Sequence, residues 1–184
     1  ERIRGEPMNI LALDLGSSTG FAYYSRPADP VIAGTWVLET ERGMRYARKL
    51  RMDRRLDPRV MALVSNLETL RRKSTIDWIF FEDVRFASSQ AQAHLWGSLR
   101  GAVWAFAHLN DIRTDCLDTG KLKKFATGSG SADKPAMMRA WCRKHPDYKY
   151  DEKKLAVLSK SGIFLDDNAC DALHLLDFAR SILK

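Results

Sequence analysis

Runs of apolar residues along the chain predict five strands. Residues 9–15 form a strongly apolar run, and residues 20–25 and 31–39 predict two further strands joined by the turn signal RPADP. These connections favour an antiparallel meander of three strands. Residues 75–83 predict a fourth strand that is apolar on both faces and ends in carboxylates, and residues 112–118 predict a fifth.

Apolar residues at helical spacing predict the helices between and after these strands. Asp57 is a suitable N-cap, Pro58 suits the first helical position, and one apolar stripe follows them, formed by Val60, Leu63, Val64, Leu67 and Leu70. Further helices are expected over 88–109, in a short basic segment from residue 119, over 133–144 and over 167–183. Residues 145–154, HPDYKYDEKK, are interpreted as a polar connection.

The order of these elements predicts an α/β fold. Three antiparallel strands are followed by two parallel strands, giving a five-stranded mixed sheet flanked by helices, in the order of the ribonuclease H-like fold. A chain of 184 residues suits one domain. We therefore expect residues 9–184 to form a single domain and residues 1–8, which end in Met8, to be an N-terminal extension.

Composition indicates the compartment. Three scattered cysteines without metal-ligand spacing favour a reducing environment and argue against structural zinc. The chain has no uncharged apolar run of about 18 residues and no secretory signal at its start, so neither a membrane span nor secretion is expected. A cytoplasmic location follows as the expectation.

The net charge of +7 is concentrated in one segment. Residues 42–73 hold eleven lysines and arginines against three acids. A local surplus of this kind suits a polyanionic partner, because phosphate contacts release condensed counterions. A solvated basic helix face is the alternative interpretation.

Carboxylates follow two of the predicted strands and recur in the last helix. Asp14 ends the first strand and Glu82 and Asp83 end the fourth, so parallel pairing would bring them to one edge of the sheet. The last helix adds Asp167 and Asp171, four residues apart on one face. Like charges held together need neutralisation, and Mg²⁺ prefers such oxygen ligands. The residues therefore predict a metal site.

Three neighbours complicate the choice of ligands in the last helix. Asp166 or Asp167 is also suited to be the N-cap of that helix. Asn168 lies three residues before Asp171, and His174 is expected to continue the same face by another turn. Asn168 and His174 are therefore additional candidates, as metal ligands or as supports for them.

Four segments together resemble the RuvC-type Holliday junction resolvases, and in particular the variants found in phages. These segments are ILALDLGSSTGFAYY, FEDVRFASSQAQAHLWGSLRG, KKFATGSGSADK and DDNACDALHLL, and they span most of the chain. The resemblance implies that Asp14, Glu82 and Asp171 are metal ligands. Where the family usually has an acid or a histidine, this chain has Asn168, and Asp167 is our candidate substitute.

The resemblance also implies residues that contact DNA. Lys123 and Lys134 match family lysines that approach the scissile phosphate, and Lys134 adds positive charge near a helix start. Arg85 occupies the place of a family aromatic residue that probes the junction centre, and Phe86 follows it. Further basic residues are expected to bind DNA because of their charge, and the resemblance does not assign those of the basic run 41–56: Lys121, Lys124, Arg48, Lys49, Arg51, Arg54 and Arg55.

The implied activity is metal-dependent cleavage of four-way DNA junctions. Two Mg²⁺ ions per site, with Mn²⁺ as a substitute, would align water with the scissile phosphate, and paired symmetric nicks would leave 5′-phosphate and 3′-hydroxyl ends. Two nicks require two sites, so a homodimer is expected, and helix 88–109 with Trp96 and Trp104 is a candidate interface. Those tryptophans are equally suited to the core.

Three other functions remain open from sequence alone. The turn DLGSSTG also resembles the first phosphate loop of actin-like ATPases, although a single copy in 184 residues does not suit a two-domain cleft. Another nuclease of this fold, acting on branched DNA, RNA or RNA–DNA hybrid, is a second alternative, because phosphate contacts carry no sequence or sugar information. A non-catalytic junction-binding protein is the third.

Overall fold

A five-stranded mixed sheet lies at the centre of the protein. The computed structural model describes residues 8–39, 57–84, 87 and 89–183. The strands are β1 (Ile10–Asp14), β2 (Ser18–Tyr24), β3 (Ile32–Val37), β4 (Trp78–Asp83) and β5 (Arg113–Asp118), in the spatial order β3-β2-β1-β4-β5. The first three strands pair antiparallel, and β4 is parallel to both β1 and β5. The predicted α/β fold class is confirmed.

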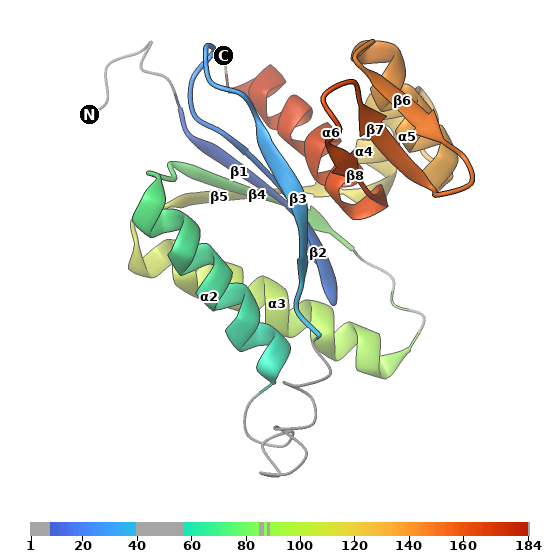
Figure 1. Cartoon of the computed structure of the whole chain (residues 1–184). Coiled ribbons are helices and arrows are strands. Elements are labelled where there is room, and N and C mark those ends of the chain that lie inside the picture. Colours follow the sequence, from blue (N-terminus) through green and yellow to red (C-terminus); the bar gives the residue numbers. More distant parts are fainter. Residues whose placement is uncertain (1–7, 40–56, 85–86, 88, 184) are drawn as a thin grey trace.

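Helices cover both faces of this sheet. The helices are α2 (Pro58–Lys73), α3 (Gln90–Leu109), α4 (Thr119–Thr127), α5 (Lys134–Lys144) and α6 (Asp167–Ile182). Figure 1 shows α2 and α3 on one face and α4, α5 and α6 on the other. Within the described ranges, no helix combines the length and the apolar character needed to cross a membrane.

The two central strands are buried on both faces. In β1, Ile10 and Ala12 pack toward the layer of α4, α5 and α6, whereas Leu11 and Leu13 pack toward α2 and α3. This period of two is what an extended chain imposes on its side chains. The apolar run at the start of the sequence is therefore explained by a strand between two helical layers.

Aspartates begin four of the helices. Asp57, Asp118, Asp133 and Asp166 are the N-caps of α2, α4, α5 and α6, and each accepts backbone N–H bonds from the first helical turn. Asp57 and Pro58 act as predicted. Of the two aspartates proposed for the last cap, Asp166 takes that role, so Asp167 lies in the first turn of α6.

The segment after α5 differs from the prediction. Residues 145–154 were expected to be a polar connection, but the structure has a second, three-stranded antiparallel sheet, formed by β6 (Tyr148–Asp151), β7 (Ala156–Ser159) and β8 (Phe164–Leu165). Val157 is buried with the core between this sheet and α6. These strands are four, four and two residues long, too short for alternation to identify them in the sequence.

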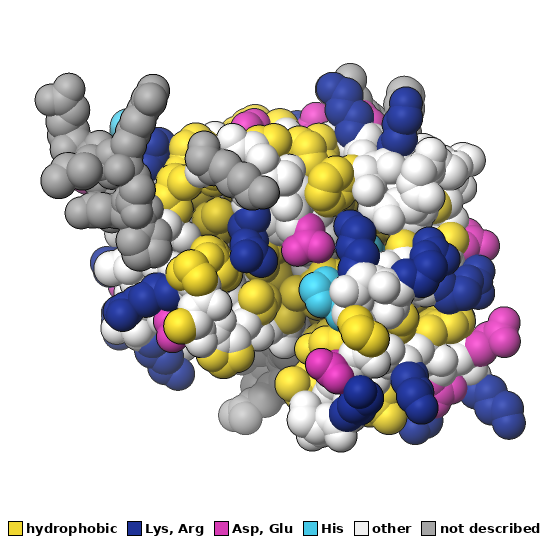
Figure 2. Space-filling model, turned by 90° about the horizontal axis from the view of Figure 1, so that it is seen from above, with side chains coloured by type: hydrophobic (Ala, Val, Ile, Leu, Met, Phe, Trp, Pro, Cys, Tyr) yellow, Lys and Arg dark blue, Asp and Glu magenta, His cyan; other side chains and the backbone are white. Residues whose placement is uncertain are grey.

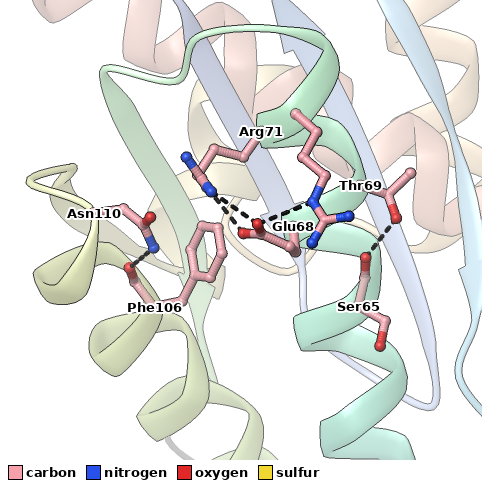
Figure 3. Close-up of polar contacts among 7 residues, drawn as sticks. Ser65, Glu68, Thr69, Arg71, Phe106 and Asn110 are labelled. Atoms are coloured by element: carbon pink, nitrogen blue, oxygen red, sulfur yellow. Dashed lines mark hydrogen bonds and ion pairs between the residues drawn. The ribbon is translucent and has the colours of Figure 1, made fainter.

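Charged side chains of both signs are mixed on the face of the molecule shown in Figure 2. On the face seen from above in Figure 2, lysine and arginine side chains lie among apolar and acidic ones. On the exposed side of α2, Glu68 accepts hydrogen bonds from Arg71 at 2.8 Å and 2.9 Å and from Arg72 at 3.2 Å (Figure 3). Seven of the eleven lysines and arginines of the basic segment 42–73 lie outside the described residues.

Candidate active site

The register of the parallel strands brings two acids together. Ile10 of β1 lies opposite Trp78 of β4, and the pairing continues to Leu13 and Phe81. One residue further along the same register, Asp14 lies beside Glu82. The two carboxyl groups are within hydrogen-bonding reach of each other. By the alternation of the strands, both side chains lie on the face that α4, α5 and α6 cover.

Asp83, the next residue, therefore lies on the opposite face. Its carboxylate accepts a 2.8 Å hydrogen bond from Arg100 of α3. The acidic pair at the end of β4 is thus divided between the two layers, and only Glu82 joins Asp14.

A glycine in β2 allows α6 to approach these acids. Gly20 pairs with Asp14 in the sheet, and a Cβ atom at Gly20 would lie 1.9 Å from the carbonyl oxygen of Asn168. Only a residue without a side chain permits this contact between β2 and the first turn of α6. The approach brings Asp167 and Asp171, from the last helix, to the strand that carries Asp14.

These residues line one cavity of about 680 Å³. It lies at the carboxyl ends of β1 and β4 and is bounded by the β1–β2 turn and by the first turns of several helices. Among its lining residues are Asp14, Glu82, Asp167, Asn168, Asp171, Lys123 and Lys134. The structure thus brings together the four acids that the sequence proposed as metal ligands, although they are far apart in the chain.

Burial and mutual repulsion disfavour the ionised form of these acids and so raise their pKa values. Burial raises the pKa of Asp14 well above its usual value, and the charges of Glu82 and Asp171 raise it further. Burial also raises the pKa of Asp171 to about 7, with Glu82 and Asp167 adding to the effect. The pKa of Glu82, which is 9% exposed, is raised mainly by burial. Carboxyl groups with such raised pKa values are typical of functional sites.

Two lysines partly offset this repulsion. The Lys134 ammonium bonds the carboxylate of Asp167, and this contact raises the pKa of Lys134. Lys134 is the first residue of α5, close to the helix start that the sequence predicted at residue 133, and Lys123 lines the same cavity from α4. The positive charge of each lysine lowers the pKa of Asp171, against the effect of burial.

Three of the predicted site residues lie elsewhere. His174 is fully buried, its Nε2 donates to the carbonyl oxygen of Met137 at 3.0 Å, and it does not line the cavity. Lys121 and Lys124 are exposed on α4 and do not line the cavity either. The residues predicted to contact DNA from the basic segment and the junction centre lie outside the described residues: Arg48, Lys49, Arg51, Arg54, Arg55, Arg85 and Phe86.

The cavity also contains residues that sequence reasoning missed. Arg59 lines it from α2, Gln92 and Trp96 line it from α3, and Thr119 lines it from α4. Thr119 donates a hydrogen bond to Glu82, which favours the ionised carboxylate. Arg59 contributed only to the count of basic residues in the sequence. The predicted helix start at Asp57 was the one local signal that placed Arg59 in the first turn of a helix.

The donor set fits a divalent cation. Several carboxylate oxygens converge on a polar cavity, and Mg²⁺ and Mn²⁺ prefer such ligands. In the described part of the chain, no three His, Cys, Asp or Glu side chains already surround a single point as metal ligands do. Repulsion among the acids opposes that arrangement, and a bound cation would offset it. Asp14, Glu82 and Asp171 are the residues best placed to hold it.

Comparison with solved structures identifies relatives of the fold. The chain is similar to Thermus thermophilus RuvC in complex with a Holliday junction substrate, with a TM-score of 0.64 and 15% identity over 95% of this chain and 96% of that one. The structure of T. thermophilus RuvC by itself gives a TM-score of 0.61 and 17% identity over the same shares. The yeast mitochondrial Holliday junction resolvase gives 0.55 and 13%, over 92% of this chain and 76% of that chain.

Sequence comparisons add no relative. No protein-family model matches the chain, and no curated protein matches it significantly. The likeness to the solved structures shows that the chain has the ribonuclease H-like fold of these resolvases.

Proposed function

We propose that the protein is a metal-dependent nuclease that resolves four-way DNA junctions. It makes paired symmetric nicks that leave 5′-phosphate and 3′-hydroxyl ends. The observation that carries the proposal is the cavity in which Asp14, Glu82, Asp167 and Asp171 meet Lys123 and Lys134. The fold supports it, because the solved structures that resemble this chain are Holliday junction resolvases, one of them in complex with its junction substrate.

In this proposal the acids hold divalent cations at the scissile phosphate. Asp14, Glu82 and Asp171 would hold the cations, and Asp167, which Lys134 bonds in this structure, would be a further ligand. Two Mg²⁺ ions, or Mn²⁺ in their place, would supply an activated water and stabilise the leaving oxygen. The hydrogen bond from Thr119 favours the ionised form of Glu82, against the effect of burial.

The lysines bind the phosphate. Lys134 faces the acids from the start of α5, and Lys123 faces them from the middle of the neighbouring helix α4. Their charges attract the DNA backbone and offset the negative charge that collects on the phosphoryl group in the transition state. When phosphate enters, Lys134 exchanges its bond with Asp167 for a bond with phosphate oxygen.

Two nicks across one junction require two such cavities, so the proposal includes a homodimer. Helix α3 offers a surface for it, because Trp104 is 49% exposed and Leu109 is 80% exposed. Trp96, in contrast, is half-buried and lines the cavity of the same subunit. Of the two tryptophans considered for the interface, Trp104 is therefore the candidate.

A panel of nucleic acids tests the function. Wild type and Asp14→Asn are incubated with Mg²⁺ and a mobile four-way junction, a flap, linear DNA duplex or RNA–DNA hybrid. We expect wild type to cut the junction in symmetric pairs, a ligase to reseal the products, and Asp14→Asn to be inactive. Preferred cleavage of flap, RNA or hybrid would assign a different nuclease of this fold. Cleavage by both proteins, or by neither, would contradict the role given to the acids.

A further inference from the structure

Arg59 reaches the acidic cavity from the opposite helical layer to the lysines. It is the second residue of α2, which covers the face of the sheet away from α4, α5 and α6 (Figure 1). Its side chain is 24% exposed and lines the cavity together with Asp14 and the β1–β2 turn. The acids are therefore flanked by positive charge from both layers.

Asp57 holds the guanidinium of Arg59 in place. Nε of Arg59 lies 3.0 Å from Oδ1 of Asp57 and Nη2 lies 2.7 Å from Oδ2, so one edge of the guanidinium faces the carboxylate. Asp57 is itself fixed as the N-cap of α2 by a 2.9 Å bond from the backbone N–H of Arg59. The side chain is thus oriented by the same residue that begins the helix, and Asp57 raises its pKa.

The remaining edge of the guanidinium is available for an anion. Arginine has five N–H donors, and those on Nη1 have no acceptor among the residues that the structure describes. Exposed Glu39 is near enough to raise the pKa of Arg59. A planar guanidinium that is anchored on one side loses little further freedom when it binds a phosphate on the other.

We propose that Arg59 binds a backbone phosphate of the DNA strand, next to the scissile phosphate, on the α2 side of the acids. The inference rests on the proposed nuclease function and extends it. A strand that crosses the carboxyl ends of β1 and β4 passes from the lysines of one layer to the arginine of the other. Arg59 therefore fixes the position of the strand on one side of the cut, and Lys123 and Lys134 fix it at the cut.

The alternative is a purely structural role, in which Arg59 only supports the start of α2. The two roles predict different results. A structural arginine would affect thermal stability and leave the salt dependence of DNA binding unchanged. A phosphate ligand contributes to that salt dependence, because each neutralised phosphate releases counterions.

Binding is measured first, with a labelled four-way junction and EDTA to prevent cleavage. Arg59→Ala should weaken binding about tenfold and reduce the slope of log K against log salt by about 0.9, the value for one phosphate contact. Arg59→Lys should restore the slope because it keeps the charge. Arg72→Ala is the matched control, since Arg72 is on the same helix, is 75% exposed and pairs with Glu68. It should bind like wild type.

Neutral phosphate analogues then identify the contact. Single methylphosphonates are placed along the cleaved strand, one position at a time. A methylphosphonate at one position beside the cut should weaken the binding of the junction to wild type. The same substitution should not weaken binding to Arg59→Ala further, because that variant has already lost the guanidinium that contacts this phosphate. A methylphosphonate at any other contacted position should affect both proteins equally.

The outcomes separate this inference from the proposed function. If wild type binds and cuts the junction while Arg59→Ala keeps the wild-type slope, or every methylphosphonate affects both proteins equally, the role of Arg59 is refuted and the nuclease stands. If wild type neither binds nor cuts any of the DNA substrates, the nuclease proposal fails, and the role of Arg59 fails with it. Melting temperatures of all variants establish that the binding differences are not due to unfolding.

Discussion

Asp171 is a proposed metal ligand, and its ionised form also lowers the stability of the folded chain. Its pKa is raised to about 7, first by burial and then by the charges of Glu82 and Asp167. An ionised carboxylate in such surroundings destabilises the folded chain, and the cation that would offset it is the one the proposed chemistry uses. Sites of this kind trade stability for function.

Replacement of this acid should therefore stabilise the protein while inactivating it. Asp171→Asn removes one repelling charge and keeps the shape of the side chain, so we expect a gain of about 1 kcal/mol, or a rise of about 2–4 °C in melting temperature without metal. Scanning calorimetry in EDTA measures this. Asp177→Asn, on the same helix but outside the cavity, should give no gain. A lower melting temperature for Asp171→Asn would contradict the repulsion described here.

Mg²⁺ should stabilise wild type more than Asp171→Asn, which reverses the difference expected in EDTA. A ligand that binds only the folded state raises its stability, so Mg²⁺ should raise the melting temperature of wild type more than that of Asp171→Asn. A titration of melting temperature against Mg²⁺ checks this without any DNA. Equal shifts for both proteins would mean that Asp171 does not hold the cation.

His174 should make stability depend on pH. Burial lowers its pKa, so the unfolded chain binds a proton at a higher pH than the folded one. Stability is then full above the unfolded pKa and falls as the pH drops toward the folded pKa. Between about pH 8 and about pH 5, His174→Gln should lose less melting temperature than wild type. His145, whose pKa burial also lowers, remains in both proteins and cancels in the comparison.

At the residue scale, the sequence revealed the acids more readily than their surroundings. Asp14, Glu82 and Asp171 were identified because each lies at a strand end or inside an apolar helix, where a charge needs a reason. His174 was assigned wrongly to the face of Asp171, because α6 is buried on several sides and its side chains diverge toward different neighbours. Arg59 was missed because the sequence does not show which arginine of a basic segment has its side chain at the cavity.

At the scale of elements, the close approach of α6 to β2 is the contact on which the site depends. Gly20→Ala would force a methyl group to within 1.9 Å of the carbonyl oxygen of Asn168, and neither backbone can yield easily. We expect a loss of about 3 kcal/mol, measured by urea unfolding. Gly101→Ala in α3 is the control, because its Cβ would meet no atom within 4 Å, and it should stabilise by about 0.5–1 kcal/mol. Similar effects of the two substitutions would refute the contact.

The elements themselves were largely predictable, with one exception. The strands of the main sheet and the helices α2, α3, α5 and α6 follow long, regular patterns, and Asp57 with Pro58 gave the start of α2 directly. The small sheet was missed because Tyr148–Asp151 alternates polar and aromatic residues over only four positions. Strand β6 is stabilised by packing against α5 and by pairing with β7, and the sequence of β6 alone shows neither contact.

At the scale of the whole molecule, the proposed dimer makes a prediction of its own. Trp104 is 49% exposed on α3, although it touches Phe81 edge-on and lies under Arg100. Trp104→Glu should convert a dimer into monomers in sedimentation equilibrium at micromolar concentration, because a charge does not tolerate burial between two helices. Phe164→Glu, at a similarly exposed residue of the small sheet, should leave the assembly unchanged. A monomeric wild type would remove the dimer from the proposal.

The positions of the acids along the chain determine when the cavity becomes complete during folding. Asp14 is made first, but its companions Asp167 and Asp171 arrive only with α6, which also fills the core beside β1 and β2. A chain folded only as far as β5 has Asp14 and Glu82 beside each other but lacks the helix that supplies the other two acids of the cavity. The proposed metal site would therefore be complete only after α6 has packed against the sheet.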